Sequence, residues 1–250
     1  MRFTALTCAA IACAASTAAA TFEVTRSTSA YHVHSDATFN LDVDNGEFIT
    51  DTQSLLDGAA PSISIASSSA VAPVSVGADA SATDSLTHSA TGYTLELAWS
   101  TQATASWPDI DNTFIDFQGL ADIRNQTRFE STQQTLLSFE GLAALTSAVG
   151  DDTIDIPLLQ IMIRSLHDAE VVYDYGDTPG DISESVLLDP GAYSVSIATT
   201  SLIEFEGFSS SDRFFLESAS LDLTVTATAI PAPSAALLLP ALAGVKRRRR

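Results

Sequence analysis

The fold is decided by one stretch near the end of the chain, Ala219-Ser220-Leu221-Asp222-Leu223-Thr224-Val225-Thr226. Apolar and polar residues alternate along it, which places all the apolar side chains on one side of an extended strand. The apolar side carries Ala219, Leu221, Leu223 and Val225. A strand with one apolar and one polar face predicts an antiparallel sheet that is covered on one side only.

The same alternation recurs through most of the body of the chain. It is clear in 37–43, 93–99 and 193–198, and shorter candidate strands occupy 114–117, 128–130, 136–139, 154–163, 171–175, 186–188 and 214–216. Two such sheets packed back to back bury both apolar faces. We therefore expect an all-β fold, an antiparallel two-sheet β-sandwich of jelly-roll-like type. With no fixed repeat and no change of composition, residues 21–229 are expected to form one domain.

Two turn signals stand between these strands. Asn45-Gly46 separates alternating runs and is typical of a tight hairpin, because both residues tolerate positive φ. Asp189-Pro190-Gly191-Ala192 predicts a type II turn, with Gly191 at positive φ, that joins 186–188 to the strand starting at Tyr193 in a second hairpin.

Two further segments are less regular. Residues 61–90 are rich in Ser, Ala, Val and Thr and fit either weak strands or a loose insertion. Within 139–149, apolar residues recur at helical spacing, which favours a short helix across the sandwich. The residues with this spacing are Phe139, Leu142, Ala143 and Leu145.

Residues 1–20 have the features of a secretory signal peptide. Arg2 precedes an apolar run, and Ala18-Ala19-Ala20 provides a small-x-small cleavage site before Thr21. Both cysteines of the chain lie inside this segment, so the exported body is expected to have no disulfide. A domain of about 200 residues can be stable without one. The implied partners are the Sec translocon and signal peptidase.

The C-terminal 21 residues, 230–250, have three parts. Pro231-Ala232-Pro233 forms a stiff hinge that can join neither a sheet nor a helix interior. An apolar run over 235–245 follows, and as a helix it would span about 16 Å, roughly half of a bilayer core. Five cations, Lys246, Arg247, Arg248, Arg249 and Arg250, close the chain and favour the cytoplasmic leaflet.

This three-part tail resembles the PEP-CTERM sorting signal of Gram-negative bacteria, here with Pro-Ala-Pro in place of the usual Pro-Glu-Pro. The resemblance implies a short hydrophobic sorting helix, transient anchoring in the membrane and cleavage by an exosortase-like membrane protease. It also implies delivery to the cell surface or extracellular matrix. An ordinary C-terminal anchor that is never cut is the alternative. The resemblance covers about twenty residues and concerns sorting, not the activity of the body.

The body is strongly acidic. Between 21 and 229 there are five arginines and all 31 acidic residues of the chain, which gives a formal charge of −26. Such a surface repels nucleic acid, and we expect no nucleic-acid partner. It favours divalent cations or basic partners, or serves solubility alone.

Loop-like acidic clusters are the candidate calcium ligands, because Ca²⁺ takes hard oxygen donors. The candidates are Asp109, Asp111, Asp116, Asp151 and Asp152. His32 and His34 share a strand face and could hold a metal, but two exposed polar residues are the simpler interpretation. No cofactor is expected apart from this open alternative of Ca²⁺.

Sequence motifs for catalysis are missing. The chain has no G-x-S-x-G, no H-E-x-x-H and no phosphate-binding glycine loop. Trp99 is in phase with the inward row, whereas Trp107, beside Pro108 and among polar residues, is the candidate for stacking on sugar rings.

Three functions fit these features. The favoured one is a non-catalytic protein of the cell surface or extracellular matrix, associated with exopolysaccharide and biofilm. The second is a carbohydrate-binding module, with or without Ca²⁺. The third is a secreted hydrolase whose site carries no recognisable motif.

Overall fold

The structure is a computed structural model, and it describes residues 21–42, 47–58, 62–71, 74–107, 113–148, 158–176, 178–209 and 213–231. Almost all of these residues lie in strands of two six-stranded sheets. Sheet A has the order β2 (Glu47–Gly58), β1 (Phe22–Asp42), β6 (Thr113–Ser131), β11 (Gly191–Ser209), β8 (Leu158–Ser165), β9 (Val171–Gly176). Sheet B has the order β10 (Gly180–Leu188), β7 (Thr135–Ala148), β12 (Arg213–Ala229), β5 (Gly92–Trp107), β4 (Val74–Ser89), β3 (Ser62–Val71).

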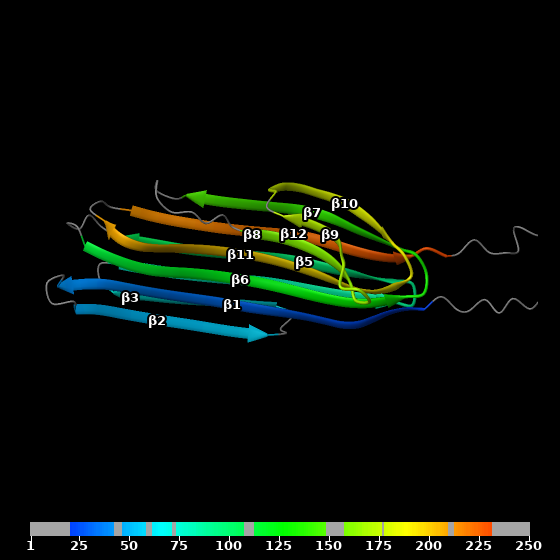
Figure 1. Cartoon of the computed structure of the whole chain (residues 1–250), viewed down its shortest axis with the longest axis horizontal. Helices are drawn as coiled ribbons and strands as arrows, with labels where there is room; N and C mark the ends of the chain where they lie inside the picture. Colours follow the sequence, from blue (N-terminus) through cyan, green and yellow to red (C-terminus); the bar gives the residue numbers. More distant parts are fainter. Residues whose placement is uncertain are drawn as a thin grey trace, which may run out of the picture.

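The two sheets lie face to face as two layers of long strands (Figure 1). All neighbouring strands run antiparallel. The chain passes repeatedly from one sheet to the other, for example between β5 and β6 and between β11 and β12. The predicted antiparallel β-sandwich of jelly-roll-like type is confirmed. No helix that could cross a membrane occurs in the described ranges.

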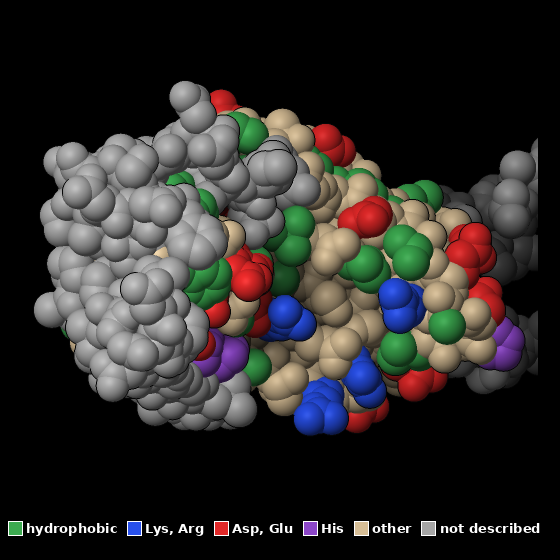
Figure 2. Space-filling model, turned by 60° about the vertical axis from the view of Figure 1, so that its left-hand side comes forward, with side chains coloured by type: hydrophobic (Ala, Val, Ile, Leu, Met, Phe, Trp, Pro, Cys, Tyr) green, Lys and Arg blue, Asp and Glu red, His purple; other side chains and the backbone are tan. Residues whose placement is uncertain are grey.

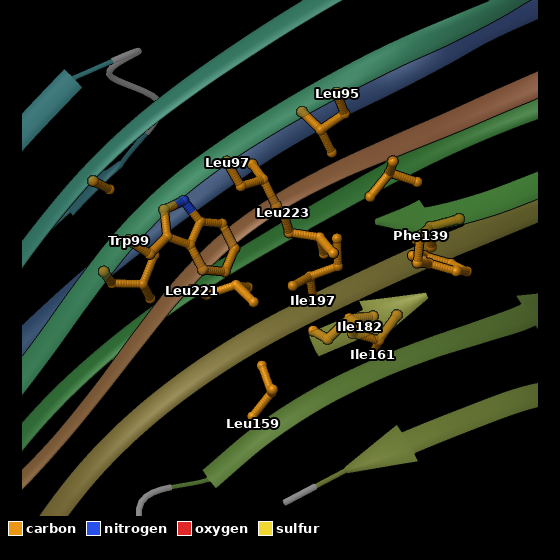
Figure 3. Close-up of a cluster of buried hydrophobic side chains, with 14 of the residues drawn as sticks. Leu95, Leu97, Trp99, Phe139, Leu159, Ile161, Ile182, Ile197, Leu221 and Leu223 are labelled. Carbon is orange, nitrogen blue, oxygen red and sulfur yellow. The ribbon is translucent and has the colours of Figure 1, made fainter. Parts of the chain in front are cut away.

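The alternation of apolar and polar residues that predicted the strands matches the alternation of buried and exposed side chains in the structure. On β12, Leu221, Leu223 and Val225 are buried, while Ser220 and Asp222 between them are exposed. The larger core cluster joins these residues to Leu95, Leu97 and Trp99 of β5 and Ile197 of β11 (Figure 3). A smaller cluster surrounds Trp107, with Phe117, Phe205 and Phe215.

A band of buried hydroxyl groups lies between the two clusters. Ser35 Oγ is 2.6 Å from Ser67 Oγ and 3.0 Å from Ser69 Oγ, and Thr101 Oγ1 is 2.8 Å from Ser201 Oγ. All five side chains are nearly inaccessible to solvent. Their mutual hydrogen bonds offset the cost of burying them.

The β1–β2 hairpin predicted at Asn45-Gly46 agrees with the pairing of the flanking strands, Asn40 with Phe48 and Asp42 with Glu47. The turn itself, 43–46, lies outside the described residues. Residues 61–90 contain two paired strands, β3 and β4, and not a loose insertion. Val74, Val76 and Ala78 of β4 are fully buried.

Two predictions of local structure were wrong. Residues 139–149 do not form a helix, because β7 runs through them between β10 and β12. Leu137, Phe139 and Ala143 are buried and Leu142 is 53% exposed, so period-two burial, not helical spacing, decides the element.

The second error is the hairpin at Asp189-Pro190-Gly191. β10 ends at Leu188 in sheet B and β11 begins at Gly191 in sheet A, so this link crosses between the sheets. The one glycine at positive φ within the described ranges is Gly180, so Gly191 does not occupy the predicted type II position. The Tyr193 hydroxyl donates to the Asp189 carbonyl at 3.0 Å and holds the crossing.

The first and last described residues lie at the same end of the sandwich (Figure 1). Thr132 N–H donates to the Thr21 carbonyl at 3.1 Å, and Ile230 N–H donates to the Gln134 carbonyl at 2.7 Å. Both ends of the body are therefore tied to the link between β6 and β7. We call this end the terminal end.

Candidate functional site

The residues predicted for processing lie at or beyond the terminal end. Thr21 is exposed, and Pro231 is exposed directly after β12. The remaining processing residues lie outside the described residues: Ala18, Ala20, Ala232, Pro233, Arg247, Arg248, Arg249 and Arg250. A protease that approached Pro231 would reach it without opening either sheet.

Of the candidate calcium ligands, only Asp116 lies in the part of the chain that the structure describes. Asp109, Asp111, Asp151 and Asp152 lie outside it. Asp116 is half-buried on the outer face of β6. Burial raises the pKa of its carboxyl group above the ordinary value, and the charges of Glu206, Asp36 and Glu204 raise it further.

This acidic zone of sheet A therefore disfavours ionisation of Asp116. The pKa of Asp116 is higher in the folded protein than in the unfolded chain, so protonation of this carboxyl group stabilises the fold at acid pH. That contribution is lost as pH rises through the folded-state pKa. Within the described residues, no three His, Cys, Asp or Glu side chains are arranged to hold a metal. His32 and His34 lie on the same face of β1, with ring centroids 6.4 Å apart.

The structure corrects the prediction for Trp107. Its side chain is 3% exposed and packs against Phe117, Phe205 and Phe215, with ring centroids 5.1 to 5.5 Å away. A ring buried in this way cannot stack on a sugar from solvent. Trp99 lies in the core as predicted, and its Nε1–H donates to Asp84 Oδ1 at 2.5 Å.

The outer face of sheet A carries a feature that sequence reasoning missed. Four of the five arginines of the body project from it: Arg26 on β1, Arg124 and Arg128 on β6, and Arg164 on β8. We call their common surface the arginine face. On the face of the molecule drawn in Figure 2, several arginine side chains surround an area of mostly uncharged surface.

The strand register aligns these arginines. Arg26 pairs with Arg128, Arg128 pairs with Ser194, and Ser194 pairs with Arg164, so three arginines stand in one row across four strands. Arg124 lies four residues from Arg128 on the same face of β6. At about 3.3 Å per residue, the Cα atoms of these two are about 13 Å apart.

Arg124 is held in place by neighbours on the same face. Its Nε is 2.7 Å from Asp122 Oδ2, and Thr200 Oγ1 donates to Asp122 Oδ1 at 2.7 Å. Arg128 is also fixed, since its Nη2 donates to Gln126 Oε1 at 3.1 Å. The arginine face is thus partly preorganised by hydrogen bonds within the sheet.

A depression of about 410 Å³ lies beside Arg124 on this face. Its floor and walls come from β1, β6, β8 and β11, and small or polar side chains predominate: Thr28, Ala30, Gln126, Gln160, Ser196, Ala198 and Thr200. The volume is within the range of small-ligand sites, although the depression is open to solvent. Hydroxyl and amide groups on its surface can both donate and accept hydrogen bonds.

The outer face of sheet B differs from the arginine face. Its described charged side chains include Asp79, Glu96, Glu140 and Asp222, all exposed. No Lys or Arg side chain among those described is exposed there. Glu96 and Asp222 line a second depression of about 310 Å³. The positive charge of the body is therefore concentrated on one face of one sheet.

Comparisons with known proteins add little. No family model matches the chain, and no curated protein matches it. Among solved structures, a GH31 alpha-xylosidase from Xanthomonas citri is similar at 10% identity and a TM-score of 0.16. The match covers 78% of this chain, which spans about 28% of the length of that enzyme. At that TM-score, the similarity carries no argument about fold or function.

Proposed function

We propose that this chain is an exported, non-catalytic protein of the cell surface or extracellular matrix, sorted through its C-terminal tail. The observation that carries the proposal is that Thr21 and Ile230 are tied to the same link, at the terminal end of the sandwich. A domain built this way can be held at one end, by a tail that follows Pro231, while both broad faces stay accessible.

The composition of the body supports the same role. It has no cysteine, so its stability does not depend on the redox state of the compartment, and two hydrophobic clusters fill the space between its sheets. Its charge of −26 keeps it from anionic membranes and nucleic acids. In the proposal, an exosortase-like protease acts near Pro231-Ala232-Pro233 and frees the body from the membrane.

Removal of residues 230–250 tests the tether. We expect the shortened protein to reach the medium in folded form, because both sheets close before Ile230 and the deletion removes only one described backbone hydrogen bond, to Gln134. The measurement is the amount of protein in the medium, together with its melting temperature and circular-dichroism spectrum.

A matched control removes only the five terminal cations, 246–250, and leaves the hinge and the apolar run in place. This variant should remain cell-associated or be mis-sorted. If the protein that lacks 230–250 stays cell-bound, the tail is not the tether. If it aggregates, the body depends on the tail for its fold.

A further inference from the structure

Fewer arginines of the arginine face form ion pairs than the number of acidic residues in the body would allow. The body holds 31 acidic residues and five arginines, so each arginine could have found a carboxylate partner. Among these arginines, Arg124 forms an ion pair, with Asp122. Arg26, Arg128 and Arg164 have no carboxylate within ion-pair distance in the described part of the chain.

These three arginines are nevertheless in one row. Leaving like charges side by side on neighbouring strands is destabilising. Accessible guanidinium groups are well suited to bind an anion, because each presents several N–H donors in a geometry that matches a carboxylate. Arg26 and Arg164 are exposed, and Arg128 is half-buried between them with its guanidinium bonded to Gln126.

The surroundings limit the kind of anion. Glu23 and Glu130 face each other beyond the arginine row, on the side of the terminal end. The acidic zone with Asp116 and Glu206 lies on the opposite side. A ligand with closely spaced charges, such as a nucleic acid, would be repelled at both edges. A ligand with widely spaced charges could place them at the arginines alone.

The depression around Arg124 indicates which uncharged groups a ligand of this face would carry. It offers hydroxyl and amide groups from Thr28, Gln126, Gln160 and Ser196 over a floor of small side chains. Such groups match the hydroxyls of sugars, and the spacing of about 13 Å between Arg124 and Arg128 leaves room for uncharged sugar atoms between two anionic groups.

We propose that the arginine face binds an anionic polysaccharide whose carboxylates are borne on separate sugar units. The chain would lie across β1, β6, β11 and β8, with carboxylates at the arginines and hydroxyls over the depression. This inference deepens the proposed function, since it rests on the body meeting such a polymer outside the cell. It names the partner class and the surface.

The test uses the protein recovered from producing cells, with hyaluronan, in which every second sugar carries a carboxylate, as the probe and the neutral glucan dextran as its uncharged counterpart. We expect binding to hyaluronan that weakens as salt rises, and no binding to dextran. The double variant Arg26→Gln/Arg164→Gln should bind at least about tenfold more weakly, because it removes two of the three arginine charges in the row.

Two controls separate a site from a general charge effect. The double variant Ser81→Asp/Thr228→Asp lowers the net charge by the same amount at exposed positions of sheet B, and its affinity should match the parent. Glu130→Gln removes a repulsive charge at the edge of the row and should strengthen binding. All five substituted positions, Arg26, Arg164, Ser81, Thr228 and Glu130, are solvent-exposed, so the variants should fold.

Several outcomes overturn the inference. One is equal binding of dextran, and another is unchanged affinity in Arg26→Gln/Arg164→Gln. Binding of single-stranded DNA as tight as that of hyaluronan would also contradict it. A salt-sensitive dimer that is lost in this variant, without polysaccharide binding, would assign the face to a second copy of the chain. These binding outcomes do not depend on export, so they are distinguishable from failure of the proposed function.

Discussion

Asp84 shows how single residues join the two sheets. From β4 it accepts hydrogen bonds from Trp99 Nε1 of the neighbouring β5, and from the Tyr31 hydroxyl and the Ser29 hydroxyl of β1 in the other sheet. Asn125 of β6 extends the network, since its Nδ2 donates to Ser29 Oγ at 2.9 Å. Tyr31 is fully buried and Trp99 is 3% exposed, so the hydrogen bonds of both side chains to this carboxylate are shielded from solvent.

Asp84→Ala is expected to destabilise the body by about 2 kcal/mol or more, because it removes the acceptor of the buried Trp99 Nε1–H and a carboxylate that joins the two sheets. Asp79→Ala, at an exposed position of the same strand, is the matched control and should change stability by less than about 0.5 kcal/mol. Chemical denaturation of both variants measures the difference. Equal midpoints would show that the network contributes nothing.

For single residues, the sequence predicted which side chains are buried better than it predicted which side chains they contact. The phase of Trp99 with Tyr93, Leu95 and Leu97 placed it in the core, because burial follows the period of the strand. Its partner Asp84 lies on another strand, and period-two alternation does not predict side-chain pairing across strands. Trp107 was misjudged because Pro108 and polar neighbours suggested a loop, whereas Trp107 is the last residue of β5.

At the scale of elements, close approach between strands restricts certain positions to glycine. A Cβ added to Gly141 of β7 would collide with the Asp222 carbonyl oxygen of β12 and lie 2.8 Å from Leu223 Cα. These atoms belong to the backbone of the neighbouring strand and cannot move aside without disturbing the sheet. The pairing of β7 with β12 therefore requires glycine at this position.

Gly141→Ala is expected to lower the free energy of unfolding by about 1–3 kcal/mol, the usual cost of forcing an extra group into a packed site. Gly191→Ala is the matched control. Its added Cβ would lie 3.4 Å from the nearest Tyr193 ring atom, an ordinary contact, and Gly191 is not at positive φ. Thermal unfolding of the two variants tests this contrast, and equal losses would contradict the β7–β12 register.

The sequence predicted correctly those strands whose apolar and polar residues alternate according to which face is buried. β5, β11 and β12 follow from alternation alone. The helix over 139–149 was wrong because Phe139, Ala143 and Leu145 fit both periods, Leu142 fits the helical period alone, and the pairing of β7 with its neighbours decides between them. The crossing at Asp189-Pro190-Gly191 was missed because turn residues predict a change of direction but not the sheet that the next strand joins.

At the scale of the whole molecule, the sandwich has a terminal end and a face with a distinct charge. Alternation predicted two sheets but not their strand order, and the arginine face depends on that order. Arg26, Arg128 and Arg164 are far apart in sequence, and only the neighbours β1, β6, β11 and β8 bring them into one row. The sequence did contain one indication of this face. Arg124 and Arg128 are four residues apart, and residues an even number apart on a strand lie on the same face.

Export of the body and its release from the tail are the central claim about this molecule. Mass spectrometry of the mature termini, on protein from fractionated cells, tests both steps in one measurement. We predict a surface or matrix form that begins at Thr21 and lacks the terminal arginines, Arg247 to Arg250. Recovery of the protein from the cytosol, with Met1 and Arg250 both present, would contradict the account.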